Sequence, residues 1–253
     1  MSDFSLPDRI DCTRHAFFLD FDGTLAPIVA RPTDARLAPG AAGILDRLVR
    51  AADGAVAVLS GRPLAEIDAM LAPLHLTGAG AHGIEIRGAD GSDLGTPVDA
   101  DLFGRLHEAL EQTAAPRGLL LERKPGALAL HYRDSPAAED TVRAAANSAA
   151  ALAPGLRAIH GKMVSEVTLA GVTKGHALRV LAATVPFAGR VPVMAGDDVT
   201  DEDGIRAAQE LGGIGIRIGP GETHARYRAR HIEEFLGWLD AATPSTKTDR
   251  RQA

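Results

Sequence analysis

The feature that most constrains this chain is an apolar run that ends in two closely spaced carboxylates. Residues 17–25 read Phe-Phe-Leu-Asp-Phe-Asp-Gly-Thr-Leu. The run predicts a strand, and the Gly-Thr pair after it predicts a turn. Beyond the strand end, Asp20 and Asp22 can point into one crevice, where two carboxylates need a counter-charge such as Mg²⁺. An aspartate can also attack phosphorus as a nucleophile. The alternative at this point is a calcium-type loop or an acidic surface turn.

The composition is that of a globular protein, with 45% hydrophobic and 24% charged residues. A length of 253 residues fits one large domain or two smaller ones. The net charge of −6, from 27 basic and 33 acidic residues, argues against nucleic acid as the main partner. Cys12 is the only cysteine, which excludes an internal disulfide or a cysteine zinc cluster. The sequence shows neither a signal peptide nor a membrane-spanning run, so we expect a cytoplasmic protein.

The pattern of strands and helices divides the chain into a core and an insertion. Core strands are expected at 16–19, 55–59, 76–80, 84–87, 191–195 and 213–218, with helices at 39–52, 63–71, 174–182, 203–211 and around 235–239. Between residues 102 and 169 the pattern becomes helix, hairpin, helix, hairpin, which is typical of an antiparallel sheet with helices on one face. Residues 1–15 are expected to be a loosely ordered leader, and 244–253 a disordered polar tail.

Three further signals follow the aspartate pair, each at the end of a predicted strand or the start of a helix. Ser60 follows the second strand, Lys174 opens a helix, and Asp197 and Asp198 follow the strand at 191–195. Open α/β sheets place their ligand sites at these strand ends. Together the four motifs resemble those of the haloacid dehalogenase-like phosphatases. The resemblance implies an α/β fold with a Rossmann-like parallel-sheet core at 1–98 and 171–243, and an inserted α/β cap domain at 99–170.

The chemistry of phosphate esters and this resemblance together imply roles for the core residues. Asp20 is expected as the nucleophile, and Asp22 as the general acid and then the base. Ser60 and Lys174 are expected to bind the phosphoryl oxygens. The resemblance implies that Asp20, the Asp22 carbonyl and Asp197 hold Mg²⁺. Asp198 and Asp201 are expected to orient this set. Glu202 and Asp203 are expected to be solvated at the start of a helix.

The predicted cap carries a polar sheet face. In the strand at 127–133, Leu128 and Leu130 share one face, while His131 and Arg133 share the other. Further polar residues occur on neighbouring predicted strands, namely Glu122, Lys124 and Glu166. Carboxylate, ammonium and imidazole groups converging on one face suit a polyhydroxylated ligand, and ordinary solvated alternation is the alternative.

A closer resemblance favours a sugar ligand. The hairpin Glu122-Arg-Lys-Pro-Gly-Ala-Leu-Ala-Leu-His-Tyr-Arg133, the segment 161–166 and the run Gly-Asp-Asp-Val-Thr-Asp-Glu202 are similar to those of the trehalose-6-phosphate phosphatases. This resemblance extends from about residue 17 to 239. It implies hydrolysis of trehalose 6-phosphate and functional coupling to a trehalose-6-phosphate synthase. It also implies a set of sugar-binding residues, with Glu122, Lys124 and Glu166 first and Arg62, His82, His131 and Arg133 lining the same cleft.

Two alternatives remain open at this point. Another sugar-phosphate phosphatase, acting on sucrose phosphate or mannosyl-phosphoglycerate, would share the core and the type of cap. A non-catalytic phospho-sugar-binding regulator would share the fold. The loss of Asp20 or Asp22 would mark such a regulator, and both are present.

Overall fold

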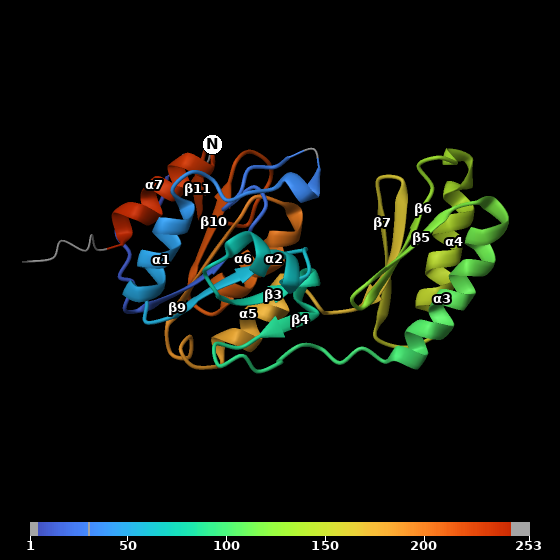
Figure 1. Ribbon diagram of the computed structural model, residues 1–253, viewed down its shortest axis with the longest axis horizontal. Coiled ribbons are helices and arrows are strands. Elements are labelled where there is room, and N and C mark those ends of the chain that lie inside the picture. Colours follow the sequence, from blue (N-terminus) through green and yellow to red (C-terminus); the bar gives the residue numbers. More distant parts are fainter. Residues whose placement is uncertain (1–4, 30, 244–253) are drawn as a thin grey trace, which may run out of the picture. The chain divides into compact units, whose positions relative to one another are not determined.

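The structure, a computed structural model, describes residues 5–29 and 31–243. The chain divides into two compact units. The first comprises the chain up to Gly95 and from Thr173 onwards, and the second runs from Thr96 to Val172. Each unit has a sheet of its own, with seven strands in the first and four in the second (Figure 1). The second unit is therefore an insertion with its own sheet.

The sheet of the first unit has the strand order β11-β10-β9-β1-β2-β3-β4. Its strands are β1 (His15–Leu19), β2 (Val56–Leu59), β3 (Thr77–Gly80), β4 (Glu85–Arg87), β9 (Val191–Gly196), β10 (Ile214–Ile218) and β11 (Tyr227–Ala229). All neighbours are parallel except β3 and β4. β1 lies in the middle, with β2 on one side and β9 on the other. The carboxyl ends of β1, β2 and β9 therefore lie side by side, which is where the sequence places its acidic and hydroxyl residues.

The central strands are buried on both faces, as their continuous apolar sequences predict. Every residue of β2 is buried, and so is every residue of β1 after His15. The helices lie on both sides of this sheet (Figure 1). They are α1 (Ala41–Ala51), α2 (Leu64–Leu71), α5 (Lys174–Ala182), α6 (Glu202–Glu210) and α7 (Ile232–Ala242), with 3₁₀ turns η1 (Pro32–Asp34), η2 (Ala81–Gly83) and η5 (Val199–Asp201). α1 packs against α7, and α5 packs against α6, so these helices cover the sheet as two pairs.

The second unit is an antiparallel sheet with the order β5-β6-β8-β7 and two long helices. Its elements are α3 (Ala100–Ala114), η3 (Ala115–Arg117), β5 (Leu120–Lys124), β6 (Ala127–His131), η4 (Pro136–Ala138), α4 (Glu139–Ala150), β7 (Leu156–Gly161) and β8 (Val164–Leu169). Leu106 and Leu110 of α3 are buried in one cluster with Leu128 and Val167 of the sheet. The opposite face of this sheet carries Glu122, Lys124, His131 and Glu166, and the exposed apolar side chains of Leu120 and Ile159 lie on the same face.

Three features differ from the sequence-based expectations or fall outside them. The segment before β1 is fastened to the core, because the Trp238 indole donates to the Pro7 carbonyl over 2.8 Å and Arg228 N donates to the Ser5 carbonyl over 2.9 Å. It is therefore not a loose leader over the residues described. β11 adds an edge strand that the sequence did not predict. The polar tail at 244–253 lies outside the described residues.

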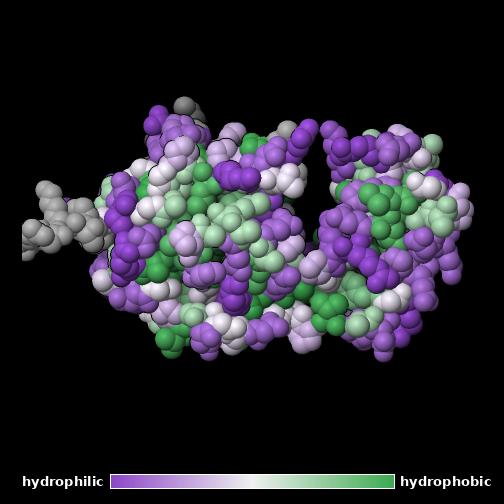
Figure 2. Space-filling view, viewed as in Figure 1, coloured by the Kyte–Doolittle hydropathy of each residue, from purple (hydrophilic) through white to green (hydrophobic). Residues whose placement is uncertain are grey.

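The surface is mostly hydrophilic on the face shown in Figure 2, with separate hydrophobic patches on each unit. The most exposed large apolar side chains are dispersed along the chain, at Ile28, Leu120, Val185 and Val199. Single exposed apolar residues of this kind are common on globular proteins. Among the helices of the described segments, none is both long enough and apolar enough to cross a membrane.

Candidate active site

A buried lysine joins two of the predicted carboxylates. The Lys174 ammonium lies 2.6 Å from Asp20 Oδ1 and 2.6 Å from Asp201 Oδ1. Asp20 follows β1, and its backbone N–H donates to the Ala195 carbonyl of β9 over 3.0 Å. Lys174 begins α5, whose N-terminus is capped by the Thr173 side chain. Residues 154 positions apart in sequence are thus held in one buried ion triad.

Burial and charge act in opposite directions on this triad. Burial raises the pKa of Asp20, the neighbouring Asp201 carboxylate raises it further, and the Lys174 ammonium opposes both. Burial by itself would lower the pKa of Lys174, but the two carboxylates outweigh it and raise the pKa above its ordinary value. Lys174 therefore stays charged and can act as a fixed cation toward a phosphoryl group.

Asp197 brings a third carboxylate to the same place. Oxygen atoms of Asp20, Asp197 and Asp201 all lie within 4.8 Å of one another. Gly23 leaves room for Asp197, since a Cβ on Gly23 would lie 2.0 Å from Asp197 Oδ2. An all-oxygen, acidic donor set fits a hard divalent cation. Burial, with the charges of Asp201 and Asp198, raises the pKa of Asp197 to about 6. A bound divalent cation would remove this repulsion.

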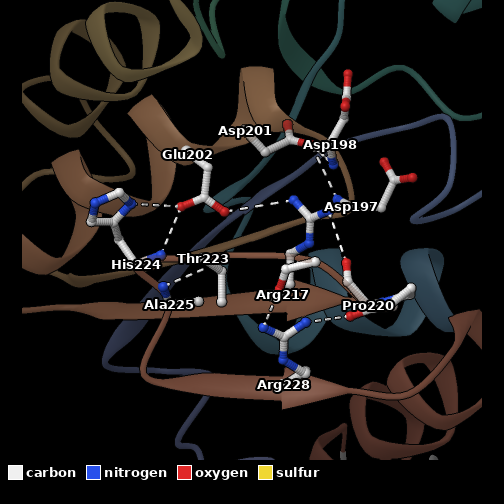
Figure 3. A network of polar contacts seen from close by, with 12 residues as sticks. Asp197, Asp198, Asp201, Glu202, Arg217, Pro220, Thr223, His224, Ala225 and Arg228 are labelled. Carbon is white, nitrogen blue, oxygen red and sulfur yellow. Dashed lines mark hydrogen bonds and ion pairs between the residues drawn. The ribbon is translucent and has the colours of Figure 1, made fainter. Parts of the chain in front are cut away.

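Asp201, which is expected to orient the other residues of the site, contacts its neighbours through both of its carboxylate oxygens. Oδ1 accepts from Lys174, and Oδ2 accepts from the backbone N–H groups of Asp197 over 3.1 Å and Asp198 over 3.0 Å (Figure 3). The side chain is fully buried. Asp198 is exposed, and its backbone N–H is one of these two donors. With both oxygens engaged, Asp201 positions the loop after β9 and the ammonium of Lys174.

Glu202 is not the solvated residue that the sequence suggested. Its carboxylate is buried and accepts from the His224 backbone N–H over 2.8 Å. Its other oxygen lies 3.6 Å from the Arg217 guanidinium (Figure 3). Arg217 in turn donates to the Pro220 carbonyl over 3.1 Å. Glu202 therefore anchors the loop that follows β10, a role that no local sequence signal indicates.

The loop after β2 presents Ser60 and Arg62. Ser60 is buried, and its Oγ accepts from the Arg62 backbone N–H over 3.1 Å, which leaves the hydroxyl proton to donate elsewhere. The Arg62 guanidinium donates to both carboxylate oxygens of Asp22, over 2.6 Å to Oδ2 and 2.8 Å to Oδ1. Arg62, expected as a sugar ligand, is thus in direct contact with the proposed proton-transfer residue.

His82 lies in a strained turn beside this loop. Ala81 and His82 have φ values of 46° and 57°, in the left-handed region that residues other than glycine rarely adopt. The His82 ring packs over Gly61, where a Cβ would lie 2.5 Å from its Cε1. A Cβ on the next residue, Gly83, would lie 2.5 Å from the Thr173 carbonyl oxygen, so the turn also approaches the start of α5 closely. The turn therefore spans the distance between the Ser60 loop and the start of α5.

The second unit gathers its predicted polar residues on one face of its sheet. Glu122 and Glu166 flank Ala129 in register, on either side of β6. The Lys124 ammonium lies 3.1 Å from Glu166 and 3.8 Å from Glu122. His131 Nε2 lies 2.9 Å from Glu122 Oε2. Arg133 is exposed beyond the end of β6, and over the described part of the chain no hydrogen bond or ion pair joins it to these residues.

Comparison with known proteins assigns these two units to one family. A family model described as trehalose-phosphatase matches residues 18–232. The trehalose-6-phosphate phosphatase of Escherichia coli K12 is 35% identical over 241 residues, covering 94% of this chain and 90% of its own length. The chain belongs to the trehalose-phosphatase family.

Solved structures support the assignment of this trehalose-phosphatase chain. A trehalose-6-phosphate phosphatase from Aspergillus fumigatus superposes with a TM-score of 0.70 at 27% identity, over 91% of this chain and 93% of its own. A phosphatase of the haloalkanoate superfamily from Bacteroides thetaiotaomicron superposes with a TM-score of 0.60 at 18% identity, over 93% of this chain and 96% of its own, and shows the fold alone. The predicted fold class, a parallel-sheet α/β core with an inserted second module, is confirmed.

Proposed function

We propose that the chain hydrolyses trehalose 6-phosphate to trehalose and phosphate. The observation that carries the proposal is the buried Asp20–Lys174–Asp201 triad at the end of β1, in a chain that matches the trehalose-phosphatase family over most of its length. A nucleophile held against a fixed cation, beside an acidic set that fits a metal, is suited to phosphoryl transfer.

The core residues take defined parts in this proposal. An Asp20 carboxylate oxygen attacks phosphorus, the bond from phosphorus to the sugar oxygen breaks, and Asp22 gives that oxygen its proton. Water then attacks the aspartyl-phosphate, Asp22 takes the water proton, and phosphate leaves Asp20. Ser60 and Lys174 donate to the phosphoryl oxygens throughout.

Mg²⁺ is the cation that we propose for the acidic set. Asp20, the Asp22 backbone carbonyl and Asp197 would hold it, with Asp198 and Asp201 orienting the set. When bound, it would supply positive charge to the phosphoryl oxygens. The oxygen-only donors and the space left by Gly23 support this part of the proposal.

The second unit would supply the sugar specificity. Glu122, Lys124 and Glu166, with His131 beside them, provide acceptors and donors for a polyhydroxylated ligand. Arg133 and His82 are further sugar ligands in this proposal. Functional coupling to a synthase that makes the same sugar phosphate stays a prediction.

The test is phosphate release from a panel of sugar phosphates, with Mg²⁺ present. We expect strong preference for trehalose 6-phosphate, lost on chelation and in Asp20→Asn, whereas the distant Asp46→Asn variant should keep it. Preference for sucrose phosphate or mannosyl-phosphoglycerate would retain the chemistry and reject the substrate. Binding without turnover of any sugar phosphate would instead support a non-catalytic regulator.

A further inference from the structure

The contact between Arg62 and Asp22 is more than a surface ion pair. Nε and one Nη of Arg62 each donate to a different oxygen of Asp22, at 2.6 and 2.8 Å. The Arg62 side chain is only 12% exposed, while that of Asp22 is 35% exposed. A bidentate arginine fork fixes the plane of a carboxylate as well as its position. Asp22 thus presents a fixed carboxylate edge that still reaches solvent.

Arg62 is itself held by contacts of its backbone and of its guanidinium. Its backbone N–H donates to Ser60 Oγ over 3.1 Å, its carbonyl accepts from Ala81 N over 2.9 Å, and its guanidinium lies 3.4 Å from Glu66 of α2. The residue therefore links the phosphate-binding hydroxyl and the proton-transfer carboxylate.

The strained turn η2 is part of the same support. His82 N donates to the Ser60 carbonyl over 3.0 Å, and Ala81 N donates to that of Arg62. Two consecutive non-glycine residues with positive φ persist only where the surrounding contacts fix them. These backbone contacts hold the Ser60–Arg62 loop in one geometry.

We propose that Arg62 is a positioning residue that holds Asp22 as a hydrogen-bond acceptor for the second half of the reaction. This inference rests on the proposed function. In that half, the water oxygen bonds to phosphorus, the bond from phosphorus to Asp20 breaks, and the water proton passes to Asp22. The two Arg62 donors occupy one lone pair on each Asp22 oxygen, and the remaining lone pairs accept from water.

A role in the second half predicts a specific kinetic signature. Removing the guanidinium should slow hydrolysis of the aspartyl-phosphate without slowing its formation. The kcat then falls, kcat/KM does not, and the phosphorylated enzyme accumulates. A sugar ligand would behave differently, because its loss would raise KM for the sugar phosphate and leave p-nitrophenyl phosphate unaffected.

The experiment compares Arg62→Met and Arg62→Lys with the wild type, using trehalose 6-phosphate and p-nitrophenyl phosphate. For Arg62→Met we expect kcat on both substrates to fall about 100-fold, the low end for loss of general base catalysis. Its kcat/KM should stay within about threefold, with a burst of roughly one nitrophenol per enzyme. Arg62→Lys, which lacks the fork, should show the same pattern more weakly.

Controls separate this role from a structural one. Arg87 forms a similar fork with Asp68, at 2.7 Å to each oxygen, away from the triad, so Arg87→Met should give no burst. In an Asp22→Asn background, Arg62→Met should add less than about a twofold loss, because the arginine acts through Asp22.

Each other outcome has a definite meaning. A raised KM for trehalose 6-phosphate alone, without a burst, would overturn the inference in favour of sugar binding. Equal losses in kcat and kcat/KM on both substrates would overturn it in favour of the first half-reaction. Turnover of p-nitrophenyl phosphate but not of trehalose 6-phosphate by the wild type would reject the proposed substrate only. Turnover of neither would reject both proposals.

Discussion

The arrangement of single residues at the end of β1 explains how several aspartates can lie close together. Lys174 neutralises part of the charge on Asp20 and Asp201, and the backbone N–H groups after β9 satisfy the other oxygen of Asp201. Asp197 is the exception, because no hydrogen bond or ion pair engages its carboxylate over residues 5–29 and 31–243. The Asp197 carboxylate instead occupies space next to Gly23, and that space exists because residue 23 has no side chain.

Gly23→Ala should therefore disable the acidic set. Its Cβ would lie 2.0 Å from Asp197 Oδ2, so Asp197 must move. We expect at least about a tenfold loss of Mg²⁺ affinity, by analogy with disturbed metal ligands, measured by calorimetric titration. Gly40→Ala is the matched control, because Gly40 has φ 83° against 82° for Gly23 but nothing within 4 Å of its added Cβ. Both variants should lose about 1 kcal/mol of stability from the strained φ. Equal Mg²⁺ affinity in the two would contradict this.

The response of the protein to Mg²⁺ should depend on pH. In the metal-free protein the pKa of Asp197 is raised to about 6, mainly by burial, and that of Asp20 is raised too. An acid with a raised folded-state pKa stabilises the folded protein at low pH and loses that contribution as the pH rises through the folded-state value. The Mg²⁺ that we propose would bind the ionised carboxylates and would therefore compete with protons. The Mg²⁺-induced rise in Tm should be large at pH 8 and shrink as the pH falls below 6. A rise independent of pH would contradict the assignment of these ligands.

Secondary-structure elements show how far the sequence predicts this fold. The strands β1, β2 and β9 are predicted because they are continuous apolar runs bounded by polar residues or glycine. β11 is not, because it has three residues and forms only by pairing with β10 after a Gly-Pro-Gly loop. Asp20 and Lys174 are predicted from their positions at a strand end and a helix start, whereas the burial of Asp201 between Lys174 and the loop after β9 is not. The fork between Arg62 and Asp22 is not predicted either, since it joins two loops 40 residues apart.

The edge of the sheet offers a test of how elements are fastened together. Arg87 on β4 donates to both oxygens of Asp68 on α2 and to the Leu76 carbonyl. The hydrogen bonds from Arg87 lower the pKa of Asp68. Because both side chains are partly exposed, Arg87→Met should lower the free energy of unfolding by about 1–2 kcal/mol at pH 7.

The stabilisation that Arg87 and Asp68 provide should depend on pH. An acid with a lowered folded-state pKa contributes stability above its ordinary value, and this contribution disappears as the pH falls through the folded-state value. The difference in the free energy of unfolding between Arg87→Met and wild type, measured by urea titration, should therefore become smaller below about pH 4. A difference that stays constant down to pH 3 would show that packing of the arginine stem, not the ion pair, fastens β4 to α2.

At the scale of the whole molecule, we propose that the core unit carries out the reaction chemistry and that the inserted unit supplies most of the sugar recognition. The core unit holds every residue that we assign to phosphoryl transfer, and the inserted unit has its own apolar clusters behind its polar sheet face. Because each unit has its own hydrophobic core, the inserted unit can vary in sequence without disturbing the triad. The same architecture can therefore serve different phosphate esters.

Glu166→Gln tests this separation. The substitution keeps the size of the side chain but removes the charge that faces Lys124 at 3.1 Å, so the ammonium loses its main partner and the sugar loses a charged acceptor. Loss of one charged hydrogen bond, about 1.5–3 kcal/mol, corresponds to roughly a 10- to 150-fold fall in kcat/KM for trehalose 6-phosphate. Turnover of p-nitrophenyl phosphate, which has no sugar hydroxyls, should change less than about twofold. Glu139→Gln is the control, because it removes an ion pair with Arg143 on the helix α4 of the same unit. Equal losses on both substrates would show that the inserted unit acts on the chemistry itself.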